Sequence, residues 1–420
     1  MLKYSSFARR CSIERLEDRR LMAGDVSARI VNGNLVVRGD DAANSIIVAH
    51  APTNANEFYV QGVNDANGVA TRVNGTANGA TTFRGFNGRI DIQLKGGNDS
   101  IVMAGIICRG LSVDLGSGND QFVEYSLTVN GDLCFNAAGG DDHVEFKTAD
   151  TSGSLKVNLG DGNNSFLMEH ATVGQRGDFK SGRGNDSFRW LDVAFDSIVV
   201  DLGDGANTLD FDSCTVNRDA QFTTGNGADS ATIVQSTVNG NLRLFLDGGN
   251  CQTTGSGNDT CQISSSKVIG NTSANLGDGD NGYFTLQHST FQGDVTFQGG
   301  KGTDFLVLYD IHVLRSLKAN FGGGTNQTSV LGITVDGRAD FIGGSGVDSF
   351  EIVGITAASL NVAMGKGNDT LKLGFSTTTQ STRIDGEDGQ DTYLVGDSGT
   401  NTLASISSRS FETLGTFHPA

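Results

Sequence analysis

Short runs of alternating apolar and polar residues recur along the chain, and a glycine-rich segment closes each group of runs. From residue 95 onward, an Asp or Asn that we call the anchor ends each glycine-rich segment. The fourteen anchors are Asp99, Asp120, Asp142, Asn164, Asp186, Asn207, Asp229, Asp259, Asn281, Asp304, Asn326, Asp348, Asp369 and Asp391. Twelve of the thirteen intervals between anchors span 21 to 23 residues, and one spans 30 because of an insertion around residues 248–254. Self-similarity at a fixed period of this size indicates a solenoid.

Each copy contains three period-2 runs, which is the alternation typical of short strands with one buried face. Three strands per copy predict an all-β fold, a right-handed parallel β-helix with about 22 residues per coil. The hand follows from the general handedness of parallel crossovers. The second run carries Val173, Val216 and Val238 at one phase, so these side chains should form one interior file. The alternative, a two-sided roll with shorter coils, agrees less well with the period.

The strict period divides the chain into four parts. Residues 95–395 form the predicted β-helix, and residues 25–94 form an N-terminal cap with irregular first coils, in which Asn44 is an additional early anchor. Within that cap, the Asn-, Gly- and Thr-rich stretch 54–88 predicts loops. Residues 396–420 are predicted to form a C-terminal cap and tail, because the ends of a solenoid expose open sheet edges that need covering. Residues 1–24 form a targeting or disordered segment.

The composition supports a stacked sheet and limits the classes of molecule that we expect the protein to bind. The chain has 59 Gly but only 2 Pro, and no Pro lies between Pro52 and Pro419. Because Pro lacks a backbone donor, its absence fits a structure in which nearly every N–H is bonded. The net charge of −18 should repel nucleic acid and anionic membranes and attract cations. No apolar run approaches the length of a membrane-spanning helix, so we expect neither nucleic-acid binding nor membrane insertion.

Seven anchors end a strict GxGxD turn. They are Asp120, Asp186, Asp229, Asp259, Asp304, Asp348 and Asp369. This turn and the strand after it resemble the GGxGxDxΦx repeat of RTX-type (hemolysin-type) proteins, where Φ is apolar. The resemblance implies Ca²⁺ held between Asp carboxylates and turn carbonyls of successive coils. Those proteins stack nine-residue units with two turns per coil, whereas this chain has one such turn per 22 residues.

A column of stacked anchors raises an electrostatic problem. Carboxylates about 4.8 Å apart repel by about 0.9 kcal/mol in water and by about 3–4 kcal/mol at an effective dielectric constant of 20. The column therefore needs cations, dilution by Asn, or raised pKa values. The Ca²⁺ ligand candidates are Asp99, Asp120, Asp142, Asp229, Asp259, Asp304, Asp348, Asp369 and Asp391, because oxygen-only ligands suit a hard cation. The alternative is a metal-free ladder, in which Asp and Asn side chains bond backbone N–H groups.

The sequence contains no evident catalytic cluster. Glu145, Arg189 and Asp210 form one polar stretch on an outward row, and the six histidines share no common phase of the repeat. We therefore expect a non-enzymatic structural or adhesion rod with polysaccharide or cell-surface partners. The alternatives are a carbohydrate-active enzyme (a lyase or hydrolase) that uses this stretch, and a carbohydrate-binding rod. Cys251 and Cys261 are either a loop-tethering disulfide or two free thiols.

The first residues are basic and lack the apolar core of an ordinary signal peptide. The segment Ile13-Glu-Arg-Leu-Glu-Asp-Arg-Arg-Leu-Met-Ala-Gly24 resembles the LEPRxLL-type motif of exported planctomycete proteins, with Asp18 in place of the usual Pro and Met22 in place of one Leu. This resemblance implies export to the cell surface or the extracellular medium, with residues 1–24 as a removable address. The alternative is a disordered basic tail.

Overall fold

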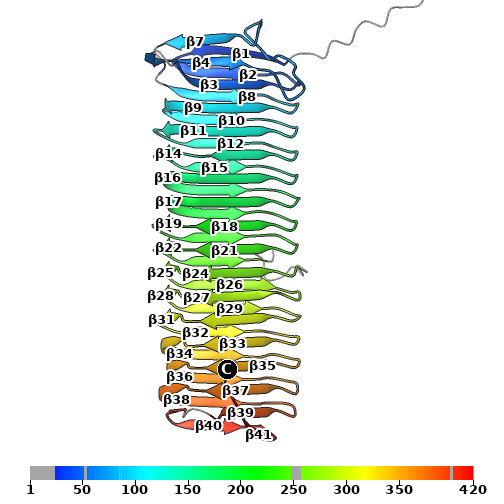
Figure 1. The fold of residues 1–420 in the computed structure, drawn as a ribbon, viewed down its shortest axis with the longest axis vertical. Coiled ribbons are helices and arrows are strands. Elements are labelled where there is room, and N and C mark those ends of the chain that lie inside the picture. Colours follow the sequence, from blue (N-terminus) through cyan, green and yellow to red (C-terminus); the bar gives the residue numbers. More distant parts are fainter. Residues whose placement is uncertain are drawn as a thin grey trace, which may run out of the picture.

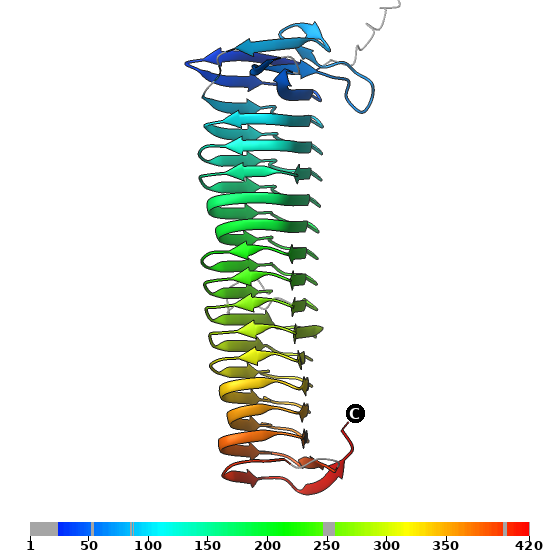
Figure 2. The same cartoon turned by 60° about the vertical axis from the view of Figure 1, so that its left-hand side comes forward.

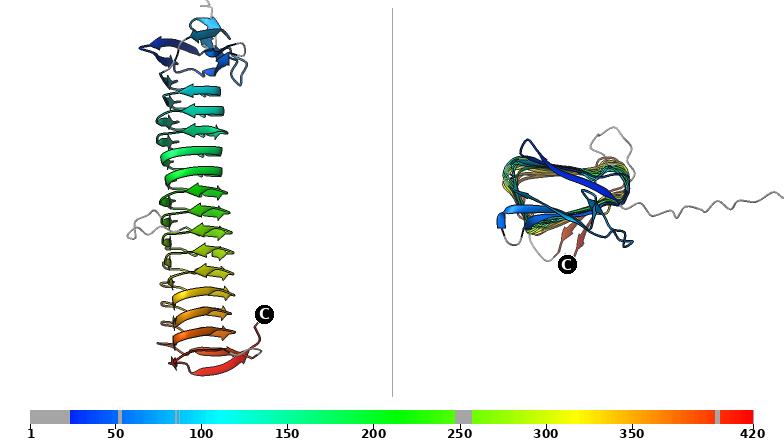
Figure 3. Two further views of the ribbon diagram at one scale, coloured as in Figure 1. Left: turned by 90° about the vertical axis from the view of Figure 1, so that its left-hand side faces the viewer. Right: turned by 90° about the horizontal axis from the view of Figure 1, so that it is seen from above.

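The structure is a computed structural model that describes residues 24–51, 54–84, 86, 88–246, 257–397 and 401–419. These residues form 41 strands and no α-helix. The strands wind into a long rod of stacked coils, with the blue N-terminal strands at one end and the red C-terminal strands at the other (Figures 1 and 2). Seen along the rod, the coils superimpose on one another (Figure 3). The predicted parallel β-helix with about 22 residues per coil is confirmed.

The first sheet contains the strand that follows each anchor. Its members are β9 (Ser100–Cys108), β11 (Gln121–Val129), β13 (His143–Phe146), β16 (Ser165–Lys180), β17 (Ser187–Asp201), β18 (Thr208–Asp212), β21 (Ser230–Val234), β24 (Thr260–Ser264), β27 (Tyr283–Gln287), β30 (Phe305–Tyr309), β33 (Gln327–Leu331), β35 (Ser349–Val353), β37 (Thr370–Gly374) and β39 (Thr392–Gly396). Each strand pairs in parallel with the strand one coil away, so the fourteen anchors open fourteen rungs of one sheet.

The other two sheets follow the same order. The second contains β14 (Ala149–Thr151), β19 (Thr215–Val216), β22 (Thr237–Val238), β25 (Lys267–Val268), β28 (Thr290–Phe291), β31 (His312–Val313) and segments of β9, β11, β16, β17, β34 (Thr334–Ile342), β36 (Thr356–Ala363) and β38 (Thr377–Asp385). The third contains β8 (Arg89–Gln93), β10 (Gly110–Asp114), β12 (Leu133–Asn136), β15 (Leu155–Asn158), β20 (Ala220–Thr223), β23 (Leu242–Phe245), β26 (Thr272–Gly277), β29 (Val295–Gly299), β32 (Leu317–Asn320) and the ends of β16, β17, β34, β36 and β38.

The interior consists of files of like side chains. Val216 pairs in register with Val238, and both Val173 and Val216 pair with Phe195 of the coil between them. The three valines are at most 2% exposed, so the predicted interior file is confirmed. No single coil could bury this apolar surface by itself, because each inward side chain is covered by its counterparts in adjacent coils.

The N-terminal end of the rod is closed by antiparallel pairs. There β1 (Asp25–Val31) pairs with β2 (Asn34–Arg38), β3 (Ser45–Ala51) pairs with β4 (Asn54–Gly62), and β4 pairs with β7 (Ala80–Arg84). Two short strands, β5 (Arg72–Val73) and β6 (Thr76–Ala77), complete this cap. The prediction of loops over residues 54–88 is therefore wrong for β4 and β7. Inward-facing Phe58 and Val60 decide the structure there, although polar residues surround them.

At the other end, β40 (Ile406–Arg409) pairs with β38, and β41 (Thr413–Phe417) pairs with β39. Phe411 contacts Tyr393 with a ring-centroid distance of 5.5 Å and covers part of the last coil. The insertion around residues 248–254, including Cys251, lies outside the described residues. No helix in the described ranges has the length and apolar character needed to cross a membrane.

Substitution of Trp190 tests whether the coils share one stacked core. Its fully buried ring contacts the rings of Phe166, Phe179, Phe188 and Phe211 at centroid distances of 5.0–6.1 Å. We predict that Trp190→Ala lowers the free energy of unfolding by about 3–5 kcal/mol, measured by chemical denaturation. The control, Ile107→Ala, removes a side chain that is 62% exposed and should change stability by less than about 0.5 kcal/mol. Equal effects of the two substitutions would contradict a core of stacked coils.

Candidate functional site

The anchors form a buried column along the rod. Each lies at the corner where the third sheet of one coil leads into the first sheet of the next, and all fourteen are at most 2% exposed. The turn before the anchor is tight. For example, Gly118 has φ +142°, and a Cβ on it would lie 1.8 Å from the carbonyl oxygen of Gly97 in the preceding coil. Glycine at this position lets the coils approach closely enough for the anchors to stack.

One hydrogen bond links each anchor to the next. The backbone N–H of Asp99 donates to Oδ1 of Asp120 at 2.7 Å, and that of Asp120 donates to Oδ1 of Asp142 at 2.9 Å. The same bond recurs along the column at 2.7–3.2 Å. Between Asn281 and Asp304, Nδ2 of Asn281 donates to Oδ1 of Asp304 at 2.7 Å. All nine Ca²⁺ candidates therefore lie in one ladder.

The ladder extends beyond the fourteen anchors at both ends. The N–H of Asn44 donates to Oδ1 of Asp99 at 2.7 Å, which confirms Asn44 as the early anchor. The N–H of Asp391 donates to Oε2 of Glu412 at 2.7 Å. Glu412 was not identified from the sequence, because it lacks the glycine-rich turn that marks the other anchors.

The backbone of the residue four positions before the anchor adopts one of two orientations. It turns either its carbonyl oxygen or its N–H toward the side chain of the anchor. Before Asn164 and Asn207 this residue is a glycine with positive φ (+77° and +71°). In both turns the anchor Nδ2 donates to that glycine's carbonyl oxygen, at 3.2 and 3.0 Å, and to the carbonyl oxygen two residues before the anchor, at 3.1 Å. We call these carbonyl-facing turns.

Asp348 shows the other orientation. The residue four before it, Gly344, has no positive φ, and its N–H donates to Oδ2 of Asp348 at 3.1 Å. In this N–H-facing turn a carboxylate accepts hydrogen bonds through both of its oxygens. Both oxygens of Asp348 are therefore hydrogen-bonded without a proton or a cation, although burial still raises the pKa of this carboxyl group above its ordinary value.

Five of the aspartates whose turns are fully described occupy carbonyl-facing turns, because the residue four before each has a φ between +66° and +98°. They are Asp99, Asp120, Asp142, Asp369 and Asp391. Their Oδ2 atoms are buried and accept no hydrogen bond within the described residues, and the same holds for Oδ2 of Asp186 and Asp304, whose turns lack the positive φ. In such a turn an asparagine would donate from Nδ2 to the turn carbonyls. The Oδ2 atom of an aspartate takes the place of Nδ2, so one hydrogen-bond acceptor faces others. Such a position is stable only when a proton or a cation lies between the oxygens.

Burial raises the pKa of these carboxyl groups. Desolvation raises the pKa of Asp99 to about 8, that of Asp142 to about 7, and those of Asp120 and Asp369 to about 6. The hydrogen bond that each Oδ1 accepts opposes this shift but does not cancel it. Near neutral pH these sites therefore lie close to the boundary between the neutral acid and the carboxylate.

The donor set of a carbonyl-facing Asp fits a hard cation. Oδ2 and the two turn carbonyls are all oxygen atoms, which Ca²⁺ prefers. Within the described part of the chain, no three His, Cys, Asp or Glu side chains gather closely enough to hold a metal ion by themselves. Any ion in the column would therefore depend on backbone carbonyls as well as on the aspartates.

The polar stretch of the first sheet does not form a compact cluster. Glu145 Oε1 and Oε2 lie 3.0 Å from His143 and Lys147, respectively, whereas Arg189 pairs with Asp210 at 3.2 Å. Glu145 and Asp210 are separated by three coil steps, or about 14 Å. Carboxylates that cleave glycosidic bonds together lie about 5–9.5 Å apart.

Two histidines occupy a shared corner that we did not identify from the sequence. His170 and His288 both have a left-handed backbone, and Nδ1 of each lies 3.0 Å from a carboxylate oxygen one coil further on, that of Asp192 and that of Asp310, respectively. The interpretation that the histidines share no phase is therefore wrong for this pair. The interval before Asp304 has 23 residues, so His288 lies one residue further from its anchor than His170 does. This difference hides their equivalent positions when only the sequence is compared.

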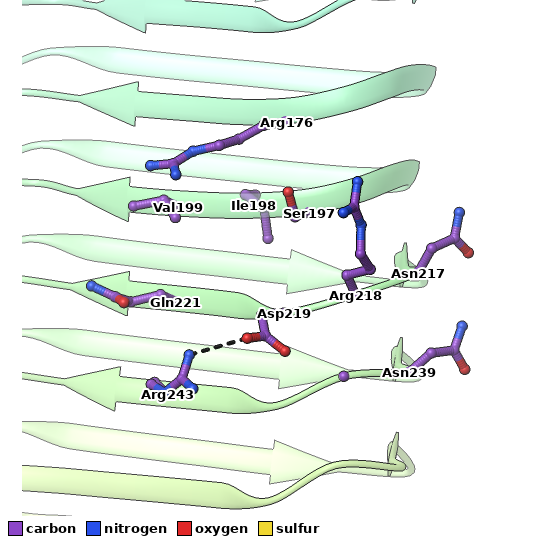
Figure 4. Close-up of a pocket in the computed structure, with 11 residues that line it drawn as sticks. Arg176, Ser197, Ile198, Val199, Asn217, Arg218, Asp219, Gln221, Asn239 and Arg243 are labelled. Atoms are coloured by element: carbon purple, nitrogen blue, oxygen red, sulfur yellow. Dashed lines mark hydrogen bonds and ion pairs between the residues drawn. The ribbon is translucent and has the colours of Figure 1, made fainter.

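A shallow groove of about 540 Å³ crosses the third sheet (Figure 4). Three arginines line it, but each has an acidic partner: Arg176 pairs with Asp178, Arg218 with Asp196, and Arg243 with Asp219. The groove therefore carries no uncompensated positive charge from these arginines. In comparisons with known proteins, no family model, no curated protein and no solved structure matches the chain.

The raised pKa values predict the sign of the pH dependence. Because the folded state holds protons that the unfolded chain has released, stability is greatest near the unfolded pKa, about 4, and is lost as the pH rises to about 8. With a chelator present, the thermal midpoint should fall across this range, because each carbonyl-facing site loses up to about 1.4 kcal/mol of stability for each pH unit between its unfolded and its folded pKa. A midpoint that stays constant or rises across this range would contradict buried protonated aspartates.

The two turn orientations predict opposite effects of one substitution. At about pH 8 in chelator, Asp120→Asn should raise the free energy of unfolding by about 1–3 kcal/mol, because Nδ2 donates to carbonyls that Oδ2 leaves unbonded. Asp348→Asn should lower it by a similar amount, because Nδ2 meets the N–H of Gly344. Denaturation curves of the two variants provide the measurement. Changes of the same sign would show that turn orientation does not set the requirement.

Proposed function

We propose that this protein is a non-enzymatic, exported β-helical rod with a structural or adhesion role, and that Ca²⁺ stabilises it at the carbonyl-facing turns. The observation that carries the proposal is the continuous buried ladder that joins every coil to the next. Such a rod presents three long sheet faces at a fixed spacing, which suits a spacer or a multivalent surface. The export part rests on the resemblance at residues 13–24, of which 13–23 lie outside the described residues.

Within the column, the proposal favours two groups of sites. Asp99, Asp120 and Asp142 are successive carbonyl-facing anchors, and Asp369 and Asp391 are another successive pair. Each group contains successive carboxylates whose Oδ2 accepts no hydrogen bond. Charge repulsion and the lack of hydrogen-bond donors therefore both favour a cation at these positions. Asp348 is a weaker candidate because Gly344 already satisfies its Oδ2. A bound Ca²⁺ would supply positive charge to these oxygens and replace their protons.

Calcium should therefore stabilise the rod most where protons are scarce. We predict that Ca²⁺ at about 100 times its dissociation constant stabilises the protein by about 2–3 kcal/mol per site near pH 8, seen as a higher thermal midpoint. Near pH 5 the increase should be smaller, because protons occupy the same oxygens. Equilibrium dialysis with metal analysis would count the bound ions.

Matched variants separate the two kinds of turn. The triple variant Asp99→Asn/Asp120→Asn/Asp142→Asn should lose part of the Ca²⁺-dependent increase, whereas Asp348→Asn should keep it. If Ca²⁺ shifts no midpoint and does not bind in dialysis, the calcium part of the proposal fails. Polysaccharide cleavage by the wild-type protein that Glu145→Ala or Asp210→Ala abolishes would overturn the non-enzymatic part.

A further inference from the structure

The first sheet has an uncharged section in the middle of an acidic rod. The outward-facing side chains of β21, β24, β27, β30 and β33 include no Asp, Glu, Lys, Arg or His. The sheet is charged on both sides of this section, with Arg189 and Asp210 toward the N-terminus and Glu351 toward the C-terminus. We call the outward face of β24, β27, β30 and β33 the neutral strip.

Aromatic side chains stand on this strip. Tyr283 is 60% exposed and Tyr309 is 41% exposed, so both present large apolar surfaces to solvent. Phe305 lies beside Tyr283 on the adjacent strand, with a ring-centroid distance of 5.3 Å. Exposed apolar surface of this kind marks an interaction site more often than a random surface position does.

Each exposed tyrosine is braced by a second ring. Phe305 packs against Tyr283, and His288 packs edge-to-face on Tyr309 at 5.0 Å. His288 is itself held by Asp310 at 3.0 Å. Rings that are fixed before binding lose less conformational entropy when a ligand packs on them.

Amide side chains border the rings. The strand register places Gln287 beside Tyr309, and Gln327 beside Phe305. The ring of Phe305 at the start of β30 and the ring of Tyr309 at its end are four residues apart, or about 13 Å along the strand. The strip thus combines flat apolar rings with neutral hydrogen-bonding groups around them.

From this juxtaposition we infer that the neutral strip binds an uncharged polysaccharide. A pyranose ring has an apolar face of C–H groups, which packs on an aromatic ring, and a rim of hydroxyl groups, which bond to amides. An acidic polysaccharide would find no cation on the strip and would meet a chain with a net charge of −18. The inference rests on the proposed adhesion role and names its partner.

The test is affinity electrophoresis of the full chain in gels that contain hydroxyethylcellulose, laminarin, galactomannan or polygalacturonate. At least one of the three neutral polymers should retard the wild-type protein, and polygalacturonate should not. Tyr283→Ala/Tyr309→Ala should weaken the retardation about tenfold or more, because two stacking surfaces are removed.

Tyr125→Ala is the matched control. Tyr125 lies five residues after its anchor, as Tyr309 does, and is 47% exposed, but its ring lies under the charged Nζ of Lys147 at 5.5 Å. This variant should bind like the wild type. Thermal melts would verify that every variant is folded. They would also keep this result separate from the calcium test, because losing the tyrosines should leave the Ca²⁺ response intact.

Four results would overturn the inference. These are no retardation by any neutral polymer, stronger retardation by polygalacturonate, the same loss in Tyr125→Ala as in the double variant, and sedimentation of a dimer that the double variant dissociates. The last result would assign the strip to contact between two copies of this chain.

Discussion

The rod depends on one hydrogen bond per coil, from an anchor to the side-chain oxygen of the next, and the donor is the backbone N–H at every step except that from Asn281 to Asp304. At the corner of each coil the chain turns too sharply for the regular sheet ladder to continue, and this N–H would otherwise be buried without a partner. A short side chain with an oxygen two bonds beyond Cβ reaches it, so Asp and Asn occupy all fourteen anchors. The glycines before the anchor then follow as a steric requirement of close stacking.

The second polar atom of each anchor side chain distinguishes the asparagines from the aspartates. Asparagine completes its bonding with Nδ2, and an N–H-facing turn completes the bonding of Asp348. Aspartate in a carbonyl-facing turn cannot complete its bonding with protein groups alone. Under the function we propose, buried acids in such turns would couple the stability of the rod to protons and to Ca²⁺.

Much of this architecture could be predicted from the sequence, because each coil repeats the same packing problem. The period located the strands, the interior file through Val216, and the anchors that form the ladder. The orientation of the turn could not be predicted, because glycine adopts either sign of φ, and even Lys95 and Ala138 adopt the left-handed one here. The cap strand β4 was missed because, among its described side chains, Phe58 and Val60 are the two buried apolar ones within a polar stretch.

The candidate site was predicted in position but not in character. Its residues were interpreted as one column of equivalent carboxylates, whereas the structure distinguishes Asp348, whose Oδ2 accepts the N–H of Gly344, from aspartates whose Oδ2 accepts no hydrogen bond. The neutral strip was not recognised at all, since it is defined by the absence of charge across several coils and appears only when these coils are aligned in register.

The most direct measurement of the central bond is residue-resolved hydrogen exchange of the anchor amides at neutral pH. The structure predicts that the N–H groups of Asp120, Asn164 and Asp348 exchange as slowly as those of the neighbouring strands, because each is buried and bonded to the next coil. Exchange of these amides at the rate of exposed turn residues would show that the ladder does not hold the coils together.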